Sequence, residues 1–296
     1  MNHLRFLRYI DEVARAGSIR QAAERLHVAA SAVNRRVQDI EEELGTPIFE
    51  RLPRGMRLTA AGEIFVRYIR GRSADLDEVR SQIEELKGLR RGSVKLVASQ
   101  ALAPVFMPRA VAGFRATHPL VAFHVTIGDH VQALQALRAF DIDLALVFNL
   151  ASEADIEPLA QYEQKLVAVM HRSHPLASRP GVRLRDCADY PVVLPNRDVA
   201  GRHLLERFMM RKSIKLRPLV ESNSFEFLRG CLHHEQAISF QIAIGAVPEG
   251  SELVALPIED RGFVHGQLVL ARLRSRQLPV IAYAFAEHVQ KALESS

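Results

Sequence analysis

The stretch from Ser18 to Gly45 constrains the fold most, because its pattern predicts two helices separated by a tight turn. Ser18 and Gln21 form a capping-box pair, so the first of these helices is expected to start at Ser18. His27-Val28 interrupts the apolar pattern, and Gly45 suits the left-handed end of the second helix. The apolar positions of that second helix recur at helical spacing and are Val33, Val37, Ile40 and Leu44.

The outer side of this second helix carries polar and basic side chains near its start. Hydrogen-bond donors in such a place suit a helix that lies in the major groove of DNA and reads base edges. An ordinary helical hairpin with a solvated basic face has the same pattern, and Arg35 or Arg36 could equally pair with Asp39 at helical spacing. The candidate DNA-contacting residues of this helix are Ala30, Ser31, Asn34, Arg35 and Arg36.

Residues 46–62 predict a two-stranded wing, followed by a helix that Thr59 caps. The wing adds three candidate DNA-contacting residues, Arg51, Arg54 and Arg57. Arg54 is expected at the wing tip, in the minor groove or on a phosphate, and the other two on the DNA backbone. A helix pair followed by a basic wing favours a DNA-binding domain over a plain helical hairpin.

The helix pair and the wing together resemble the N-terminal domain of the LysR-type transcriptional regulators. The matching residues are Ala22-Ala23, Leu26, Glu41 to Gly45, Ile48 to Arg51, Leu58-Thr59 and Gly62. Because so many fixed offsets agree, the resemblance is specific. It implies a winged helix-turn-helix over residues 1–58, double-stranded DNA as a partner, and a homodimer that assembles into a homotetramer. It also allows contact with RNA polymerase.

Three positions of the DNA-binding helix depart from the family pattern. Ala29 and Ala30 stand where a capping hydroxyl and a glutamine are common, and Asn34 stands where serine is usual. The DNA sequence that this protein reads is therefore expected to differ from the family's commonest site.

Residues 59–91 predict one long helix with a narrow apolar seam. The seam residues alternate in steps of four and three, with Arg72 in the one charged position. This heptad pattern favours pairing with the same helix of a second copy, although packing against its own domain is an alternative. The candidate dimerisation residues are Phe65, Ile69, Leu76, Val79, Ile83 and Leu86.

Residues 92–296 predict an α/β module, because strand-like and helix-like segments alternate along them. Units of this size favour a parallel sheet covered on both faces. The family resemblance implies a two-lobed module like a periplasmic binding protein, with lobe I at 92–161 and 268–296 and lobe II at 162–267. Strands are expected at 94–98, 122–127, 144–148, 166–170, 192–194, 219–221, 238–240 and 265–273. Helices are expected at 104–117, 131–140, 201–211, 225–233 and 279–293, besides 4–16 near the N-terminus.

Polar residues follow several of these strands, where α/β sheets bind ligands. The candidate effector-binding residues are Ser99, Gln100, Asp129, Phe148, Asn149, Asn196, Ser224 and Phe240. Ser99, Asp129 and Ser224 could each serve only as helix caps. As a set they favour a cleft for a small polar metabolite, with no cofactor.

Two departures bear on that cleft. Asp129 stands where relatives that bind carboxylates commonly have a hydroxyl residue, so an effector with an amine or amide group is compatible with this position. His234 and Gln236 replace a glycine pair, which predicts a bulkier wall. A DNA-binding architectural protein with a ligand-free module, or a DNA-binding α/β enzyme, therefore remains an alternative to an effector-controlled regulator.

No metal or catalytic site is expected. Adjacent histidines on a helix point about 100° apart, so His233-His234-Glu235 cannot hold one ion. No G-x-S-x-G motif is present, so hydrolase chemistry lacks its nucleophile. Cys187 and Cys231 are too few for a disulfide framework, which suits a reducing cytoplasm. No apolar run spans a membrane, and no cleavable signal precedes Leu4, so a cytoplasmic protein is expected.

Overall fold

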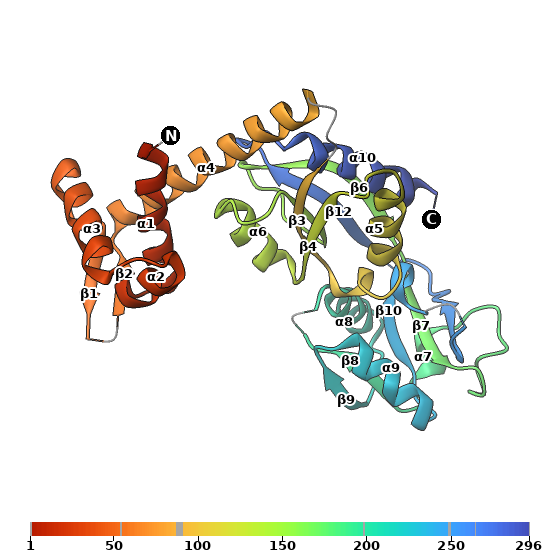
Figure 1. Ribbon diagram of the computed structural model, residues 1–296. Coiled ribbons are helices and arrows are strands. Elements are labelled where there is room, and N and C mark those ends of the chain that lie inside the picture. Colours follow the sequence, from red (N-terminus) through yellow and green to blue (C-terminus); the bar gives the residue numbers. More distant parts are fainter. Residues whose placement is uncertain are drawn as a thin grey trace. The chain divides into compact units, whose positions relative to one another are not determined.

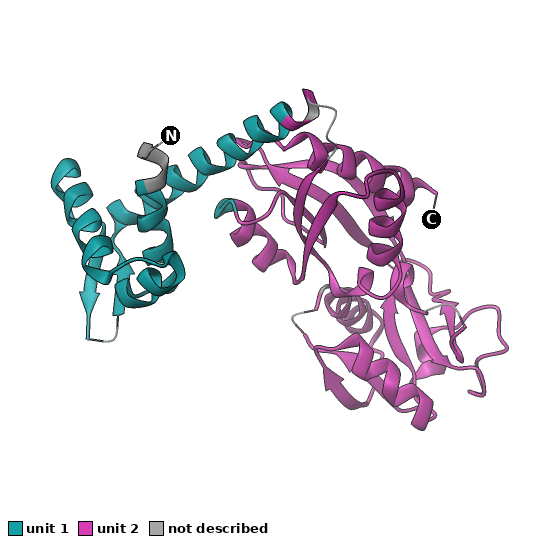
Figure 2. Ribbon diagram, in the orientation of Figure 1, with its two compact units in different colours: residues 1–83, 138–140 teal, residues 84–137, 141–296 magenta. Residues whose placement is uncertain are grey.

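The structure is a computed structural model that describes residues 2–53, 55–86, 91–197, 199–247, 250–263 and 265–295. The chain forms two compact units, Met1–Ile83 with Arg138–Phe140, and Glu84–Leu137 with Asp141–Ser296 (Figure 2). Each unit has its own hydrophobic core. In the described part of the chain, no helix has both the length and the apolar character needed to cross a membrane.

The first unit is a helical domain with a β-hairpin wing (Figure 1). Its elements are α1 (Asn2–Ala16), α2 (Ile19–Leu26), α3 (Ala30–Leu44), β1 (Phe49–Leu52), β2 (Gly55–Leu58) and α4 (Ala60–Leu86). The hydroxyl of Ser18 accepts a hydrogen bond from the backbone N–H of Gln21, and the residues after α2 and α3, His27 and Gly45, are left-handed. The predicted helix pair and wing are thereby confirmed.

The core of this unit forms where α1, α2 and α3 meet. Val33 and Val37 are buried, as their spacing predicted, and they pack with Ile10 and Val13 of α1. Leu44 is the exception, because 43% of its surface is exposed. The contacts of α3 with this core extend only as far as Ile40, so the last turn of the helix projects into solvent.

Glu41 fixes the start of the wing through the backbone. Its carboxylate oxygen Oε1 accepts hydrogen bonds from the N–H groups of Ile48 (2.8 Å) and Phe49 (3.0 Å). These two N–H groups belong to the segment that leaves α3 and enters β1. A single carboxylate therefore satisfies two donors and sets the position of the wing relative to α3.

Thr59 and Gly62 fix the other end of the wing. The hydroxyl of Thr59 donates to the carbonyl oxygen of Pro47 (2.7 Å) and accepts from the N–H of Gly62 (3.0 Å), which caps α4 as predicted. A Cβ atom built at Gly62 would lie 2.0 Å from the carbonyl oxygen of Ile48. Only glycine allows α4 to start this close to the wing.

The outer surface of α4 differs from the predicted seam. Ile69 is 1% exposed and packs into the core of the first unit, so its assignment to a dimer seam was wrong. Phe65 is half-buried against the same core. The alternative, packing of the helix against its own domain, holds for this part of α4. The exposed apolar side chains of α4 are Ile64, Tyr68, Val79, Ile83 and Leu86, with Leu76 half-buried. We call these six residues the α4 stripe.

The second unit contains two groups of elements, which we call lobe I and lobe II (Figure 1). Lobe I comprises β3 (Gly92–Ala98), η1 (Gln100–Leu102), α5 (Phe106–Thr117), β4 (Val121–Ile127), α6 (His130–Arg138), β5 (Leu144–Phe148), β6 (Ile156–Gln164), β12 (Gly266–Leu273) and α10 (Val280–Glu294). Lobe II comprises β7 (Leu166–His171), α7 (Leu184–Cys187), β8 (Val192–Pro195), α8 (Ala200–Lys212), β9 (Pro218–Ser222), α9 (Phe225–His234), β10 (Ser239–Ile242), η2 (Ala243–Gly245) and β11 (Leu253–Pro257).

The sheet of lobe I has the strand order β4-β3-β5-β12-β6. β3 pairs in parallel with β4 and β5, as predicted, whereas β12 runs antiparallel to both of its neighbours. The chain returns from lobe II to lobe I through β12. This strand enters the sheet from the end opposite to the one at which β3, β4 and β5 enter it. The parallel pairing predicted from the first three strands is confirmed, while β12 and β6 make the complete sheet mixed. β6 was not predicted as a strand.

Lobe II is also mixed. β10, β7 and β11 form an antiparallel sheet, and β8 pairs in parallel with β9. β11 and the short α7 were not predicted. Because β6 extends to Gln164 and β12 starts at Gly266, lobe I reaches slightly beyond the boundaries expected from the sequence.

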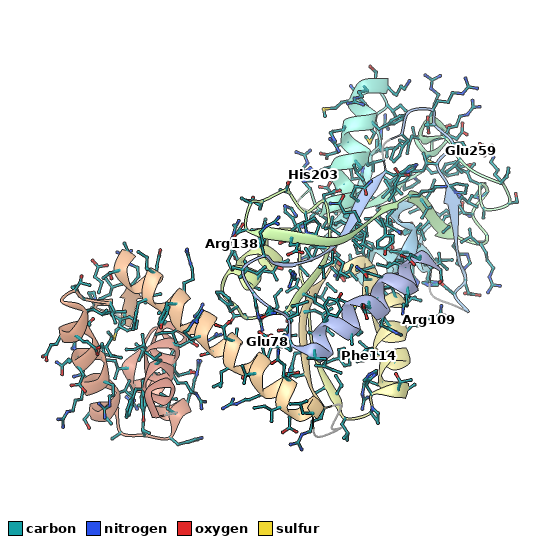
Figure 3. All side chains as sticks on the ribbon, turned by 90° about the horizontal axis from the view of Figure 1, so that it is seen from above. Glu78, Arg109, Phe114, Arg138, His203 and Glu259 are labelled. Atoms are coloured by element: carbon teal, nitrogen blue, oxygen red, sulfur yellow. The ribbon has the colours of Figure 1, made fainter. Side chains whose placement is uncertain are left out.

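Aromatic side chains hold two helices of lobe I on its sheet. Phe114 of α5 is labelled in Figure 3. It meets Phe285 of α10 edge to face, with ring centroids 5.3 Å apart. Phe123 of β4 lies 4.7 Å from Phe285 by the same measure. Such contacts add to the burial of apolar area that stabilises this face of the lobe.

Candidate functional site

The start of α3 presents an exposed face. Ala30, Ser31 and Arg35 are exposed, and Arg35 makes no hydrogen bond or ion pair within the described residues. Ala29, the N-cap residue, provides no side-chain hydrogen bond to the first turn of α3. The backbone N–H groups of Ala30 and Ser31 and the guanidinium of Arg35 are thus available to an external acceptor, whereas the N–H of Ala32 donates to the carbonyl oxygen of Ala29.

Arg36 is held within its own domain. Its guanidinium pairs with Asp39 at 3.0 Å and lies 4.1 Å from the ring centroid of Phe6 on α1. The salt bridge that the sequence allowed for either arginine is therefore formed by Arg36. The two neighbouring arginines, equivalent in sequence, differ in what they can still bind.

The wing arginines also have internal partners. Arg51 donates to the side-chain oxygen of Asn34 at 2.8 Å, which links β1 to α3. Arg57 pairs with Glu50 across the hairpin at 2.6 Å. Arg54 lies outside the described residues. The interactions of Arg51 and Arg57 join distant parts of the sequence, so spacing along the chain gave no sign of them.

A cavity of about 300 Å³ lies between lobe I and lobe II. Its lobe I wall consists of Ser99, Gln100, Ala101, Ile127, Gly128, Asp129, His130, Gln132 and Phe148. Its lobe II wall consists of Val199, Gly201, Asn223, Phe225 and Ile242. The polar groups of both walls converge where strand ends and helix starts meet, which is the usual place for a ligand in α/β folds.

Four of the predicted effector-binding residues line this cavity, namely Ser99, Gln100, Asp129 and Phe148. The structure places the other four elsewhere. Asn149 bonds to the backbone of Gln267, Asn196 to the backbone of Ser222, Ser224 caps α9, and Phe240 is buried in the core. The sequence missed Asn223 and Phe225, which are immediate neighbours of Ser224, and His130 and Gln132, which follow Asp129.

Hydrogen bonds fix the polar wall of the cavity. The amide oxygen of Gln100 accepts from the backbone N–H of Phe225 at 3.2 Å, so lobe I is bonded directly to the start of α9 in lobe II. The hydroxyl of Ser99 accepts from the N–H of Phe148 at 3.2 Å. Asp129 accepts from the N–H of Gln132 at 2.8 Å, so it does cap α6, and it is exposed at the cavity.

Comparison with known proteins places these two sites in one family. Residues 4–63 match the bacterial regulatory helix-turn-helix proteins of the lysR family, and residues 87–294 match the LysR substrate binding domain. The chain therefore belongs to the LysR family of transcriptional regulators. It is a DNA-binding regulator with an effector-binding domain, and its relatives are regulators rather than enzymes.

Similar proteins of this family are transcriptional regulators. The RuBisCO operon transcriptional regulator of Allochromatium vinosum is 29% identical over 97% of this chain and 95% of that protein. The HTH-type transcriptional regulator PcaQ of Agrobacterium fabrum is 30% identical over 86% of this chain and 84% of that protein.

Solved structures of full-length relatives share the fold. A full-length OxyR variant from Pseudomonas aeruginosa aligns with a TM-score of 0.73 at 20% identity, covering 97% of this chain and 94% of that one. Full-length CbnR in complex with its target DNA aligns with a TM-score of 0.66 at 20% identity, covering 98% and 99%.

Proposed function

We propose that this regulator reads base edges with the start of α3 and that Arg35 is its main specificity residue. The observation that carries this proposal is the contrast between the two neighbouring arginines. Arg36 is paired with Asp39, whereas Arg35 is exposed and unpaired within the described residues. An arginine that donates two hydrogen bonds to a guanine contributes about 1–3 kcal/mol of discrimination. Ala30, Ser31 and Asn34 would contact neighbouring bases or phosphates, and Arg51, Arg54 and Arg57 the DNA backbone.

Arg35→Ala is expected to weaken binding to an operator selected from random DNA by about tenfold or more, and binding to scrambled DNA far less. Binding isotherms on both DNAs at several salt concentrations measure this. Arg20→Ala is the matched control, because Arg20 is an equally exposed arginine that pairs with Glu24 on α2. An Arg35→Ala protein with an unchanged ratio of the two affinities would show that this face does not read bases.

For the cavity between the lobes, the proposed ligand is a small polar metabolite that carries an amine or amide group. The volume of the cavity, about 300 Å³, lies at the small end of the range for ligand pockets. Asp129 would hold the amine, and Ser99, Gln100 and Asn223 would provide the remaining polar contacts. Because Gln100 bonds to Phe225 across the lobes, a ligand that replaced this bond would alter how the lobes are joined.

Asp129→Asn is expected to reduce the affinity for an amine-bearing effector by about 10–100-fold, since a hydrogen bond to a charged group contributes about 1.5–3 kcal/mol. Asparagine still caps α6, so the fold is retained. Candidate metabolites are first screened by thermal shift, and calorimetry then compares the variants. Asp189→Asn, the same change at an exposed carboxylate outside the cavity lining, is the control with unchanged affinity. If no metabolite stabilises the protein, that result favours the alternative of an architectural DNA-binding protein with a ligand-free module.

Assembly into a homotetramer is proposed to use two self-interfaces. The α4 stripe would form the first, because it exposes apolar side chains on one side of a long helix. β4 and β9 would form the second, since both are edge strands with exposed apolar residues, among them Val125 and Leu219. Such a regulator would act in the cytoplasm, where DNA and RNA polymerase are its partners.

A further inference from the structure

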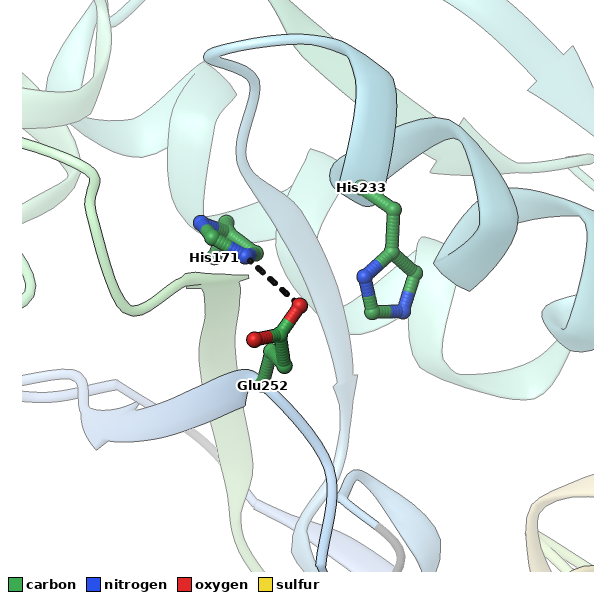
Figure 4. Close-up of side chains that lie close together, drawn as sticks. All are labelled: His171, His233 and Glu252. Atoms are coloured by element: carbon green, nitrogen blue, oxygen red, sulfur yellow. Dashed lines mark ion pairs between the residues drawn. The ribbon is translucent and has the colours of Figure 1, made fainter.

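Three side chains with metal-binding groups meet on lobe II, away from the cavity. His171 is the last residue of β7, His233 lies in the last turn of α9, and Glu252 directly precedes β11. One ligand atom from each lies within 4.8 Å of the others, and Figure 4 shows the three side chains converging. We propose that these residues bind a divalent transition-metal ion of the zinc type.

The kinds of ligand and their spacing suit zinc. Two imidazoles and one carboxylate leave a fourth position for water, as in many zinc sites with three protein ligands. Zinc–nitrogen bonds of about 2.0–2.1 Å place tetrahedral ligands roughly 3.3 Å apart. His171 Nε2 and Glu252 Oε2 are already 3.6 Å apart, and the side chains of His233 and Glu252 are exposed rather than held in a packed core.

Neighbouring groups orient two of the ligands. The Nδ1 atom of His171 lies 2.7 Å from the hydroxyl of Ser173 and 3.2 Å from the backbone nitrogen of the same residue, which leaves Nε2 facing Glu252. An ion at Nε2 requires the ring proton on Nδ1, where it would be donated to the Ser173 hydroxyl. Arg172 donates to Oε1 of Glu252, so Oε2 remains for an ion. The positive charge of Arg172 opposes a cation, so the affinity is expected to be below that of a four-ligand structural site.

The backbone holds the site together. Leu253, next to Glu252, pairs with His171 in the antiparallel sheet, and the N–H of Arg172 donates to the carbonyl oxygen of Glu252 at 2.8 Å. Glu252 therefore cannot move away from His171 without breaking the sheet edge. α9 brings the third ligand from outside this sheet.

A simple surface ion cluster of His171, Arg172 and Glu252 does not account for His233. In the described residues, His233 makes no hydrogen bond or ion pair, and its ring lies 5.9 Å from that of His171 between centroids. Its neighbour His234 is not part of the cluster, as the helical geometry requires. The sequence expectation of no metal site was argued from the adjacent residues 233–235, and spacing along the chain gave no sign that His171 and Glu252 lie beside them.

The test is calorimetric titration of the metal-stripped full-length protein with Zn²⁺ at neutral pH. One high-affinity ion per chain is expected, and His171→Ala and His233→Ala should each lower the affinity at least tenfold. His234→Ala is the matched control, because it removes an exposed imidazole from the next position of the same helix and should leave binding unchanged. His233→Gln should behave like His233→Ala, and circular dichroism without metal checks that each variant is folded.

Two results would overturn the site. One is a wild-type protein that takes up no Zn²⁺. The other is a pair of variants, His233→Ala and His234→Ala, with the same affinity for Zn²⁺, since the ion would then be held elsewhere or by histidines in general. Neither result bears on DNA reading or on the cavity between the lobes.

Discussion

Arg276→Met is expected to lower the free energy of unfolding by about 3–5 kcal/mol, because it leaves a buried carboxylate without its counter-charge. Arg276 and Asp143 are 7% and 3% exposed. The guanidinium pairs with the carboxylate of Asp143 at 2.6 Å and donates to the carbonyl oxygen of Ile142 at 2.6 Å. Asp143 in turn accepts from the backbone N–H of Lys95 at 2.8 Å, so the pair joins β3, β5 and the segment after β12. Urea unfolding measures the loss.

The double variant Asp143→Asn with Arg276→Met should be less destabilised than Arg276→Met alone. It removes the buried charge, and the asparagine oxygen still accepts from Lys95. Equal losses in the single and double variants would show that packing, rather than the uncompensated charge, causes the effect.

The loss in free energy of unfolding caused by Arg276→Met should also become smaller as the pH falls. Burial raises the pKa of Asp143, against the opposing effect of Arg276. A carboxyl group with a raised pKa binds its proton more tightly in the folded state than in the unfolded state, so acidification favours the folded state. Removing Arg276 increases that difference. Unfolding curves of variant and wild type, recorded from neutral pH toward about pH 5, should therefore converge.

Val79→Asp combined with Ile83→Asp is expected to halve the mass of the assembly in light scattering. The two residues are 47% and 45% exposed at the centre of the less interrupted half of the α4 stripe. Paired with a second copy they would be buried, and two carboxylates at that interface would lose their hydration. Affinity for an operator with two half-sites should fall on the order of 100-fold, because the two DNA-binding domains no longer bind as one ligand.

A control with the same added charge keeps this result interpretable. Arg67 and Ser73 are exposed and lie on the sides of α4 away from the stripe, at about 100° per residue. Ser73→Asp combined with Arg67→Gln changes the net charge by the same amount and should leave both the mass and the operator affinity unchanged. A Val79→Asp, Ile83→Asp protein with wild-type mass would place the dimer interface on another surface.

Local signals were sufficient to place the helix ends of the DNA-binding domain. The cap at Ser18, the left-handed His27 and Gly45, and the cap at Thr59 are interactions between residues a few positions apart, so they can be predicted from sequence alone. Helical spacing likewise predicted that Val33 and Val37 are buried. The same spacing could not say which neighbour an apolar residue of α4 meets, and Ile69 packs into its own domain rather than facing a partner.

The tertiary structure decided whatever depends on long-range packing. Chain order predicted that Ser99, Gln100 and Asp129 follow parallel strands, but only the packing of lobe II shows that Asn223 and Phe225 close the cavity around them. Arg35 and Arg36 are adjacent and chemically identical, and the contact of Arg36 with Asp39 and Phe6 distinguishes them. His171, His233 and Glu252 have no spacing that signals a site, because a sheet and a helix far apart in the sequence bring them together.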